Sequence, residues 1–197
     1  MLKILTAPHP TLSQKAKPVL KIDKGAQRLI GEMKESLAYA KDPIGVGLAA
    51  VQVGKNLRIF IAKPGTKAVV FTLINPKIIT QKDKLSAATR LPKPGTGGQE
   101  PAEHKPLGHA RKLEGCLSLP NIWGDVQRHD EIFLEYLDEG GKAHKRKFKG
   151  FLATIVQHEL DHLNGVLFPK RVLEQKGTLY KSEKDEKGED VFEELKV

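Results

Sequence analysis

The chain has 197 residues, a formal net charge of +9 and a single cysteine. This length predicts one domain with a substantial core. One cysteine excludes an intramolecular disulfide, which favours a reducing compartment. No run approaches the roughly 20 apolar residues of a membrane span, and Lys3 is not followed by the apolar segment of a secretory signal. We therefore expect a cytoplasmic protein.

The N-terminal part predicts an extended arm, a helix and a loop. Three prolines exclude a continuous helix from residues 2–20. From Asp23, a suitable N-cap, apolar residues follow the period of a helix that ends near Lys41. Residues 45–54 then predict a loop, whose glycines let the backbone approach a ligand closely. Within it, Gln52 supplies an amide that can donate a hydrogen bond.

The middle of the chain predicts two strands and one long loop. β-Branched and aromatic residues favour strands at 58–62 and 69–76. Residues 81–112 are rich in proline and glycine and poor in large apolar residues, so we expect a loop that is ordered only at its ends. Its two histidines, His104 and His109, are expected to be exposed and not to bind metal.

The last third predicts a hairpin, a buried helix and a second hairpin. Strand-like alternation at 130–138, followed by two glycines, predicts a β-hairpin that ends at 143–148. Apolar residues fill a helix at 151–163, which Gly165 can cap. The charged tail beyond residue 173 predicts a terminal hairpin. We therefore expect an α+β fold, with mixed or antiparallel β-sheets packed around a central helix, an N-terminal helix and a C-terminal β-hairpin.

Two histidines lie one turn apart in the predicted buried helix. His158 and His162 share one helix face, so both imidazoles can bind one divalent metal. Glu159 lies beside them as a candidate general base. The alternative is an ordinary pair of histidines on an amphipathic helix, but burying an uncoordinated imidazole is costly. The sequence therefore predicts a metal site on this helix.

A tetrahedral catalytic site needs a third protein ligand. Six residues after His162, where some zinc endopeptidases carry a third histidine, stands Phe168, which cannot bind metal. The only cysteine, Cys116, is a better candidate. Cys116 can instead be a nucleophile beside a histidine. That alternative leaves Glu159 without a role, so we favour the thiolate as a metal ligand.

Three segments resemble the signature motifs of the peptide deformylase family, in the family's order. They are Gly45-Val-Gly-Leu-Ala-Ala-Val-Gln52, Glu114-Gly-Cys-Leu-Ser118 and Gln157-His-Glu-Leu-Asp-His162. Residues 4–12 also resemble the family's N-terminus. The resemblance implies a catalytic domain over 1–173, with an unusual insertion at 81–112. Residues 174–197 are expected to be a charged extension of the same domain.

The resemblance implies a metal-dependent hydrolase that removes the N-formyl group from the N-terminal methionine of new proteins and releases formate. The implied metal ligands are Cys116, His158 and His162. A metal-bound water attacks the formyl carbon, while Glu159 takes its proton and passes it to the leaving amine. Gln52 and the backbone N–H of Leu117 are implied donors to the tetrahedral intermediate. Ferrous iron is the implied metal, with zinc, nickel or cobalt as substitutes.

Further residues are expected to bind the substrate or to support the metal ligands. The expected substrate-binding residues are Gly45, Val46, Gly47, Glu114, Gly115, Trp123, Phe151 and Ile155. Phe151 and Ile155, one turn apart, are placed to line the methionine pocket and also to pack in the core. Trp123 is equally compatible with substrate contact and with simple packing. Supporting residues are expected at Glu114, Gln157, Asp161 and Arg128, with an ion pair between the last two.

A cluster of basic residues precedes the predicted helix at 151–163 and could bind an anionic partner. Its members are Lys142, Lys145, Arg146, Lys147 and Lys149. Such a cluster is either a solvated strand face or a transient contact with ribosomal RNA. We expect N-formylmethionyl nascent peptides as partners, and neither DNA nor membranes. A zinc endopeptidase and a non-enzymatic RNA-binding protein are rival interpretations. The missing downstream ligand argues against the first, and the presence of metal-ligand and base residues argues against the second.

Overall fold

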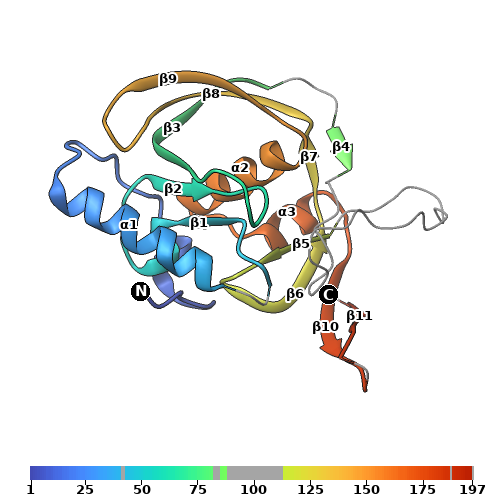
Figure 1. The fold of residues 1–197 in the computed structure, drawn as a ribbon. Helices are drawn as coiled ribbons and strands as arrows, with labels where there is room; N and C mark the ends of the chain where they lie inside the picture. Colours follow the sequence, from blue (N-terminus) through green and yellow to red (C-terminus); the bar gives the residue numbers. More distant parts are fainter. Residues whose placement is uncertain (41–42, 82–84, 88–112, 187, 197) are drawn as a thin grey trace.

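The computed structural model describes residues 1–40, 43–81, 85–87, 113–186 and 188–196. Figure 1 shows a central helix, α2 (Gly150–Leu163), with one sheet arched over it and a second sheet below. The strands that pair within each sheet are antiparallel. This architecture confirms the predicted α+β fold.

A five-stranded sheet with the order β1-β2-β3-β8-β9 covers one side of α2. Its strands are β1 (Gly47–Ala49), β2 (Ile59–Ala62), β3 (Phe71–Gln81), β8 (Glu131–Leu137) and β9 (Ala143–Lys149). The predicted alternation of β8 is present, since Ile132, Leu134 and Tyr136 are buried while their neighbours are partly exposed. β8 pairs with β9 along its whole length, which confirms the predicted hairpin.

The second sheet has the order β11-β10-β6-β5 and carries the C-terminal hairpin. Its strands are β5 (Leu113–Cys116), β6 (Leu119–Asp125), β10 (Leu179–Lys184) and β11 (Asp190–Leu195). β10 and β11 pair from Leu179↔Leu195 to Lys184↔Asp190, which confirms the predicted terminal hairpin. The first half of β10 also pairs with β6. The charged extension is therefore joined to the strand that follows Cys116.

The N-terminal helix, α1 (Lys24–Tyr39), agrees with its prediction. The Asp23 side chain accepts a hydrogen bond from the Ala26 N–H at 2.9 Å, so it caps the helix as expected. Two short 3-10 helices, η1 (Pro10–Ser13) and η2 (Ala50–Val53), and a short helix, α3 (Phe168–Glu174), complete the helical elements. None of the helices in the described ranges has the length and apolar character needed to cross a membrane.

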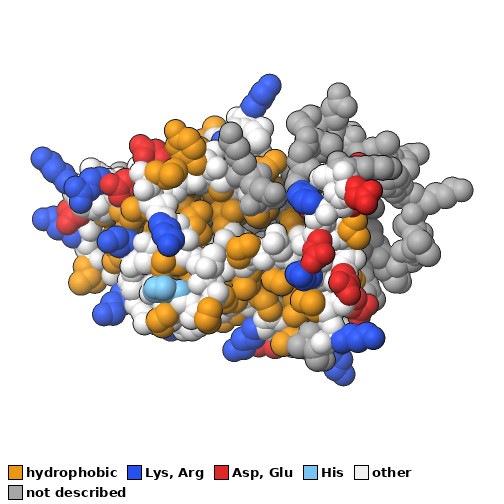
Figure 2. All heavy atoms as spheres, turned by 90° about the horizontal axis from the view of Figure 1, so that it is seen from below, with side chains coloured by type: hydrophobic (Ala, Val, Ile, Leu, Met, Phe, Trp, Pro, Cys, Tyr) orange, Lys and Arg blue, Asp and Glu red, His pale blue; other side chains and the backbone are white. Residues whose placement is uncertain are grey.

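The central helix is fixed by apolar packing on the side away from its histidines. Val156, Leu160 and Leu163 are buried against Phe60 and Leu73 of the five-stranded sheet. Each such side chain contributes about 1.5–3 kcal/mol when it is fully buried. This packing sets the rotation of α2 about its axis and turns the remaining face toward β5. Figure 2 shows one outer face of the molecule, where apolar side chains gather across the middle and most Lys and Arg side chains lie toward the edges.

One prediction about loops is corrected by the structure. Residues 45–54 are not an irregular loop, because β1 and η2 form within them and pair with β2 or pack in the core. This difference reflects the full burial of Leu48, which local composition does not reveal. Near the start of the predicted loop 81–112, β4 (Leu85–Ala87) pairs with β7 (Gln127–His129), in keeping with order at the end of that loop. Residues 88–112, with His104 and His109, lie outside the described residues.

Candidate metal centre and active site

The three predicted metal ligands converge where β5 meets α2. One donor atom from each of Cys116, His158 and His162 lies within 4.8 Å of the others. Cys116 Sγ and His162 Nε2 are 3.2 Å apart, and both residues are buried. A thiolate and two imidazoles are a donor set that suits zinc and other divalent transition metals. The residues present therefore fit the predicted metal.

The two histidines differ in how their surroundings treat a positive charge. Burial lowers the pKa of His162 well below its usual value, and the neighbouring charge of His158 adds to this effect. Burial likewise opposes the charged form of His158, but its contacts with Cys116 and Glu114 prevail and hold its pKa well above the usual value. These contacts therefore favour a positive charge at His158 and a neutral His162, and a neutral imidazole is the form that binds metal.

A buried ion-pair chain orients the imidazole of His158. The Nδ1 of His158 lies 3.0 Å from Glu114 Oε2, which leaves Nε2 for a metal. Arg128 donates two hydrogen bonds to Glu114 at 2.8 and 2.9 Å and one to Asp161 at 2.7 Å. Burial opposes the charge of Glu114, but Arg128 lowers its pKa to about 2. The predicted contact between Arg128 and Asp161 is thus present, and the pair shares Arg128 with Glu114.

The sequence did not predict that Arg171 would join this series of buried ion pairs. Arg171 of α3 donates to Asp161 at 2.7 Å and to Glu174 at 2.9 Å. Arg171 is ten residues from Asp161 and on another helix, so no helical spacing in the sequence connects them. Gln157, a predicted supporting residue, instead exchanges hydrogen bonds with the backbone of His129 and thereby ties α2 to β7.

Glu159 is buried beside the three predicted metal ligands, on the wall of a narrow cleft of about 50 Å³. Its carboxylate lies directly against Gly47, since a Cβ at that glycine would be 2.8 Å from the carboxyl carbon. Its Oε2 makes no hydrogen bond with any residue that the structure describes. Burial raises the pKa of Glu159 to about 7. A carboxyl group of this kind can both accept and return a proton near neutral pH.

Gln52 is held in one orientation by its surroundings. Its Oε1 accepts the Ala49 N–H at 2.7 Å, and its Nε2 donates to Ser118 Oγ at 3.1 Å. The same Nε2 lies 3.6 Å from Cys116 Sγ. The amide donor therefore faces the ligand cluster. Leu117, next to Cys116, lines the same cleft.

Most of the predicted substrate-binding residues line this narrow cleft. They are Val46, Gly47, Glu114, Gly115, Phe151 and Ile155. Ile44 and Thr154 also line it and were missed, because neither residue type marks a site by itself. Gly45 is absent from the residues that line the cleft. It packs against the end of α1, where a Cβ would lie 2.9 Å from the carbonyl oxygen of Leu37.

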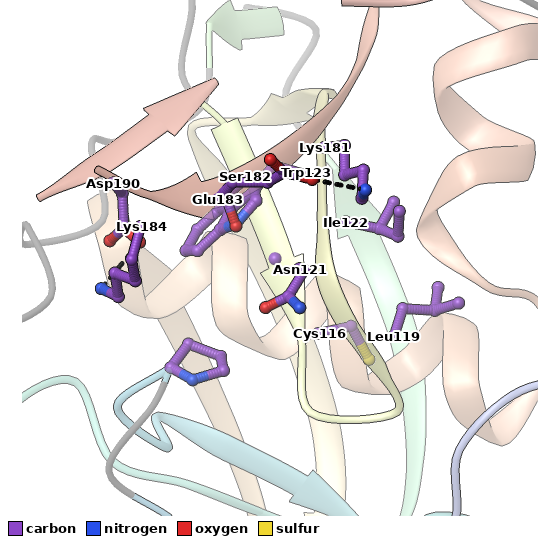
Figure 3. A pocket seen from close by; sticks show the side chains of 12 residues that line it. Cys116, Leu119, Asn121, Ile122, Trp123, Lys181, Ser182, Glu183, Lys184 and Asp190 are labelled. Atoms are coloured by element: carbon purple, nitrogen blue, oxygen red, sulfur yellow. Dashed lines mark hydrogen bonds and ion pairs between the residues drawn. The ribbon is translucent and has the colours of Figure 1, made fainter. Parts of the chain in front are cut away.

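Trp123 lies in a neighbouring groove of about 350 Å³, shown in Figure 3. The indole is buried, and its Nε1 donates to Ser182 Oγ of β10 at 3.0 Å. Its ring lies against Gly115, where an added Cβ would be 2.9 Å from ring carbons. Packing, one of the two roles expected for Trp123, is therefore present.

Comparison with known proteins identifies the family. Residues 1–177 match the family model described as polypeptide deformylase. A peptide deformylase of Halothermothrix orenii is 38% identical over 173 residues, which cover 88% of this chain and 94% of that protein. The crystal structure of the peptide deformylase from Thermotoga maritima superposes with a TM-score of 0.70 at 31% identity, covering 87% of this chain and 97% of that one. The chain therefore belongs to the polypeptide deformylase family.

Proposed function

We propose that this protein removes the N-formyl group from the N-terminal methionine of newly synthesised chains and releases formate. The observation that carries the proposal is the convergence of Cys116, His158 and His162 beside the buried carboxylate of Glu159. Family membership supports the same reaction. Since formylated chains leave the ribosome in the cytoplasm, we place the activity there.

The three converging residues would hold a divalent metal, for which we propose ferrous iron, with zinc, nickel or cobalt as substitutes. When bound, such an ion activates water and polarises the formyl carbonyl. The ion-pair chain through Glu114 and Arg128 fixes the ring orientation of His158. Ligands held in this way keep their geometry through each turnover.

Glu159 is the proposed proton carrier. It takes a proton from the attacking water and later delivers it to the leaving amine of methionine. Its place against Gly47, where no side chain intervenes, keeps the carboxylate at the cleft wall. Because burial raises its pKa to about 7, the protonated form needed for the second step is accessible.

Two donors are proposed for the oxygen that becomes negatively charged during attack. The first is Nε2 of Gln52, whose orientation is fixed by Ala49 and Ser118. The second is the backbone N–H of Leu117, beside Cys116. A fixed donor of this kind stabilises the transition state by about 3 kcal/mol. We assign the methionine side chain to the apolar part of the cleft, between Phe151 and Ile155.

We also propose that the charged extension belongs to the catalytic domain and that β9 makes a transient contact with ribosomal RNA. Pairing of β10 with β6 supports the first point. For the second, Arg146 stacks over Phe71 at 4.5 Å and is exposed on this edge strand together with Lys145, whereas Lys147 and Lys149 pair with Glu131. Basic side chains fixed along an edge suit phosphate groups.

The experiment uses iron-loaded protein made without oxygen, with formyl-Met peptide and its unformylated counterpart as substrates. We expect formate from the first peptide and no new amine from internal cleavage of either. Replacing Cys116 with Ser should reduce bound metal and formate release together, because a neutral hydroxyl is a poor substitute for a thiolate. Cleavage of internal peptide bonds would instead identify an endopeptidase.

A further inference from the structure

We infer that the N-terminal arm, residues 2–16, is a positioning element of the proposed active site. The backbone N–H groups of Leu5 and Ala7 set the spacing between the segments that carry the two proposed donors, Gln52 and Leu117. This inference rests on the proposed function, because it concerns the donors for that reaction. It gives a role to the segment at residues 4–12, which takes no part in the chemistry proposed above.

Two backbone hydrogen bonds join the arm to these segments. The Leu5 N–H donates to the carbonyl oxygen of Gln52 at 2.7 Å. The Ala7 N–H donates to the carbonyl oxygen of Ser118, the residue that follows Leu117, at 2.9 Å. Gln52 and Ser118 are 66 residues apart in the sequence, so their spacing depends on contacts formed in the fold. Two donors that lie two residues apart in the arm bridge that distance.

The same two segments also meet directly, at the proposed donor. Gln52 Nε2 donates to Ser118 Oγ at 3.1 Å, so a ring of contacts runs from the arm through Gln52 and Ser118 and back to the arm. A group that acts on the reacting atoms must be held within about 0.5 Å of its productive position. A misplacement of 1 Å can cost about 10²-fold in rate. Movement of either carbonyl would therefore change the position of Nε2.

Both ends of the arm are anchored independently of these two hydrogen bonds. Near its start, the Leu2 N–H donates to Ser36 Oγ of α1 at 2.7 Å. Near its end, Leu12 is 1% exposed, and the Ala16 N–H donates to the carbonyl oxygen of Leu163 at 2.9 Å. Leu163 is the last residue of α2, the helix that carries both predicted histidine ligands. The middle of the arm is thus held between fixed points and can hold the donor segments in turn.

The residue between the two donors provides a matched control. The side chain of Thr6 is exposed, and among the residues that the structure describes its N–H donates to no backbone carbonyl. Removal of the Thr6 N–H therefore changes the arm chemically at the same place without removing a contact to Gln52 or Ser118.

The test replaces single amide N–H groups with ester oxygens. The full chain is made by cell-free synthesis with the α-hydroxy analogue of Leu5, Thr6 or Ala7, so each side chain is retained. Loss of one hydrogen bond at Leu5 or at Ala7 should lower kcat for a formyl-Met peptide roughly three- to tenfold, with KM unchanged. The ester at Thr6 should leave kcat at the wild-type value. Calorimetry checks that each protein is folded at the assay temperature.

A combined variant separates positioning from a general loss of stability. If the arm acts through Gln52, the ester at Leu5 should lower kcat no further when Gln52→Ala is already present. A purely structural role would instead lower kcat by the same factor in both proteins. That additive result, an unchanged kcat in the Leu5 ester, or equal decreases for the Leu5 and Thr6 esters would overturn the inference.

A second measurement does not depend on catalysis. The side-chain amide of Gln52 gives NMR signals in zinc-loaded protein labelled at glutamine, and Gln52→Ala identifies them by their absence. These signals should shift and show a lower order parameter in the Leu5 ester, but not in the Thr6 ester. Unchanged signals in the Leu5 ester contradict the inference. Absence of formate release by the wild-type protein refutes the proposed function instead, and the NMR comparison then still decides whether the arm positions Gln52.

Discussion

The centre of the molecule and its C-terminal hairpin both contain ion pairs, but of opposite kinds. Around α2, the side chains of Arg128 and Glu114 are 6% and 5% exposed and joined by two hydrogen bonds. On β10, the side chains of Lys181 and Glu183 are 49% and 64% exposed. Water screens the second pair and not the first. Charge pairs near the predicted metal ligands therefore fix geometry, whereas those on the hairpin constrain it little.

The largest effect is expected from the buried centre, at Glu159. Glu159→Ala removes the proposed proton carrier but none of the three proposed metal ligands, so formate release should fall about 10²- to 10⁴-fold with metal still bound. Elemental analysis and a formate assay measure both quantities. Loss of the metal in this variant would show that Glu159 is a ligand and that its role is misassigned.

Arg128→Met tests the stability of the buried ion pairs. It leaves Glu114 and Asp161 without their shared cation, which should cost about 3–5 kcal/mol of unfolding free energy. For a domain of this size, Tm should fall by roughly 6–20 °C in calorimetry. Arg171→Met is the matched control, since the side chain of Arg171 is 34% exposed and contacts the same Asp161. An equal loss in both variants would contradict the distinction between buried and exposed pairs.

Gln52 is an uncharged residue of the buried centre, and hydrogen bonds with Ala49 and Ser118 fix its amide. Gln52→Ala should lower kcat about 10²- to 10³-fold, because a fixed donor to the developing charge is lost. Gln52→Glu retains an oxygen for the Ala49 N–H but has no donor, so a similar decrease is expected. Steady-state kinetics with formyl-Met peptide, with circular dichroism as a check on folding, measure both variants. Normal kcat in Gln52→Glu would remove Gln52 from the oxyanion site.

The smallest effect is expected on the hairpin. Lys181→Ala removes one member of an exposed pair, so neither Tm nor kcat on a short formyl-Met substrate should change measurably. Thermal denaturation and the formate assay at two salt concentrations provide the measurement. A marked, salt-sensitive loss of stability would mean that the hairpin charges hold the fold together, contrary to the comparison above.

Local pattern was sufficient to predict much of the fold and two of the candidate metal ligands. The spacing of His158 and His162 predicted that both lie on one helix face. The only cysteine, Cys116, was the candidate third ligand, a role that the family resemblance also implied, and the structure places it beside them. The helix capped by Asp23 and both hairpins follow from capping and alternation. These features depend on residues close together in the sequence.

Features that depend on distant residues were missed or only partly predicted. Arg171 of α3 reaches Asp161 of α2 only in the folded chain, and no sequence period records that contact. The conformation of residues 45–54 is set by burial against β2 and α1 and was wrongly predicted as a loop. Gly45 resembles a substrate-binding glycine in its motif, but its missing side chain makes room for the end of α1.

The pairing of β10 with β6 also bears on how the protein becomes active during its own synthesis. The metal ligands lie at residues 116–162, whereas the strand that borders β6 is made from residues 179–184. Because a chain leaves the ribosome from its N-terminus, the ligand cluster can assemble while β6 still has an open edge. Unpaired edges invite association with other chains. Residues translated after the predicted ligands therefore close the edge of β6, and a chain interrupted before residue 179 would carry those ligands beside an unprotected strand.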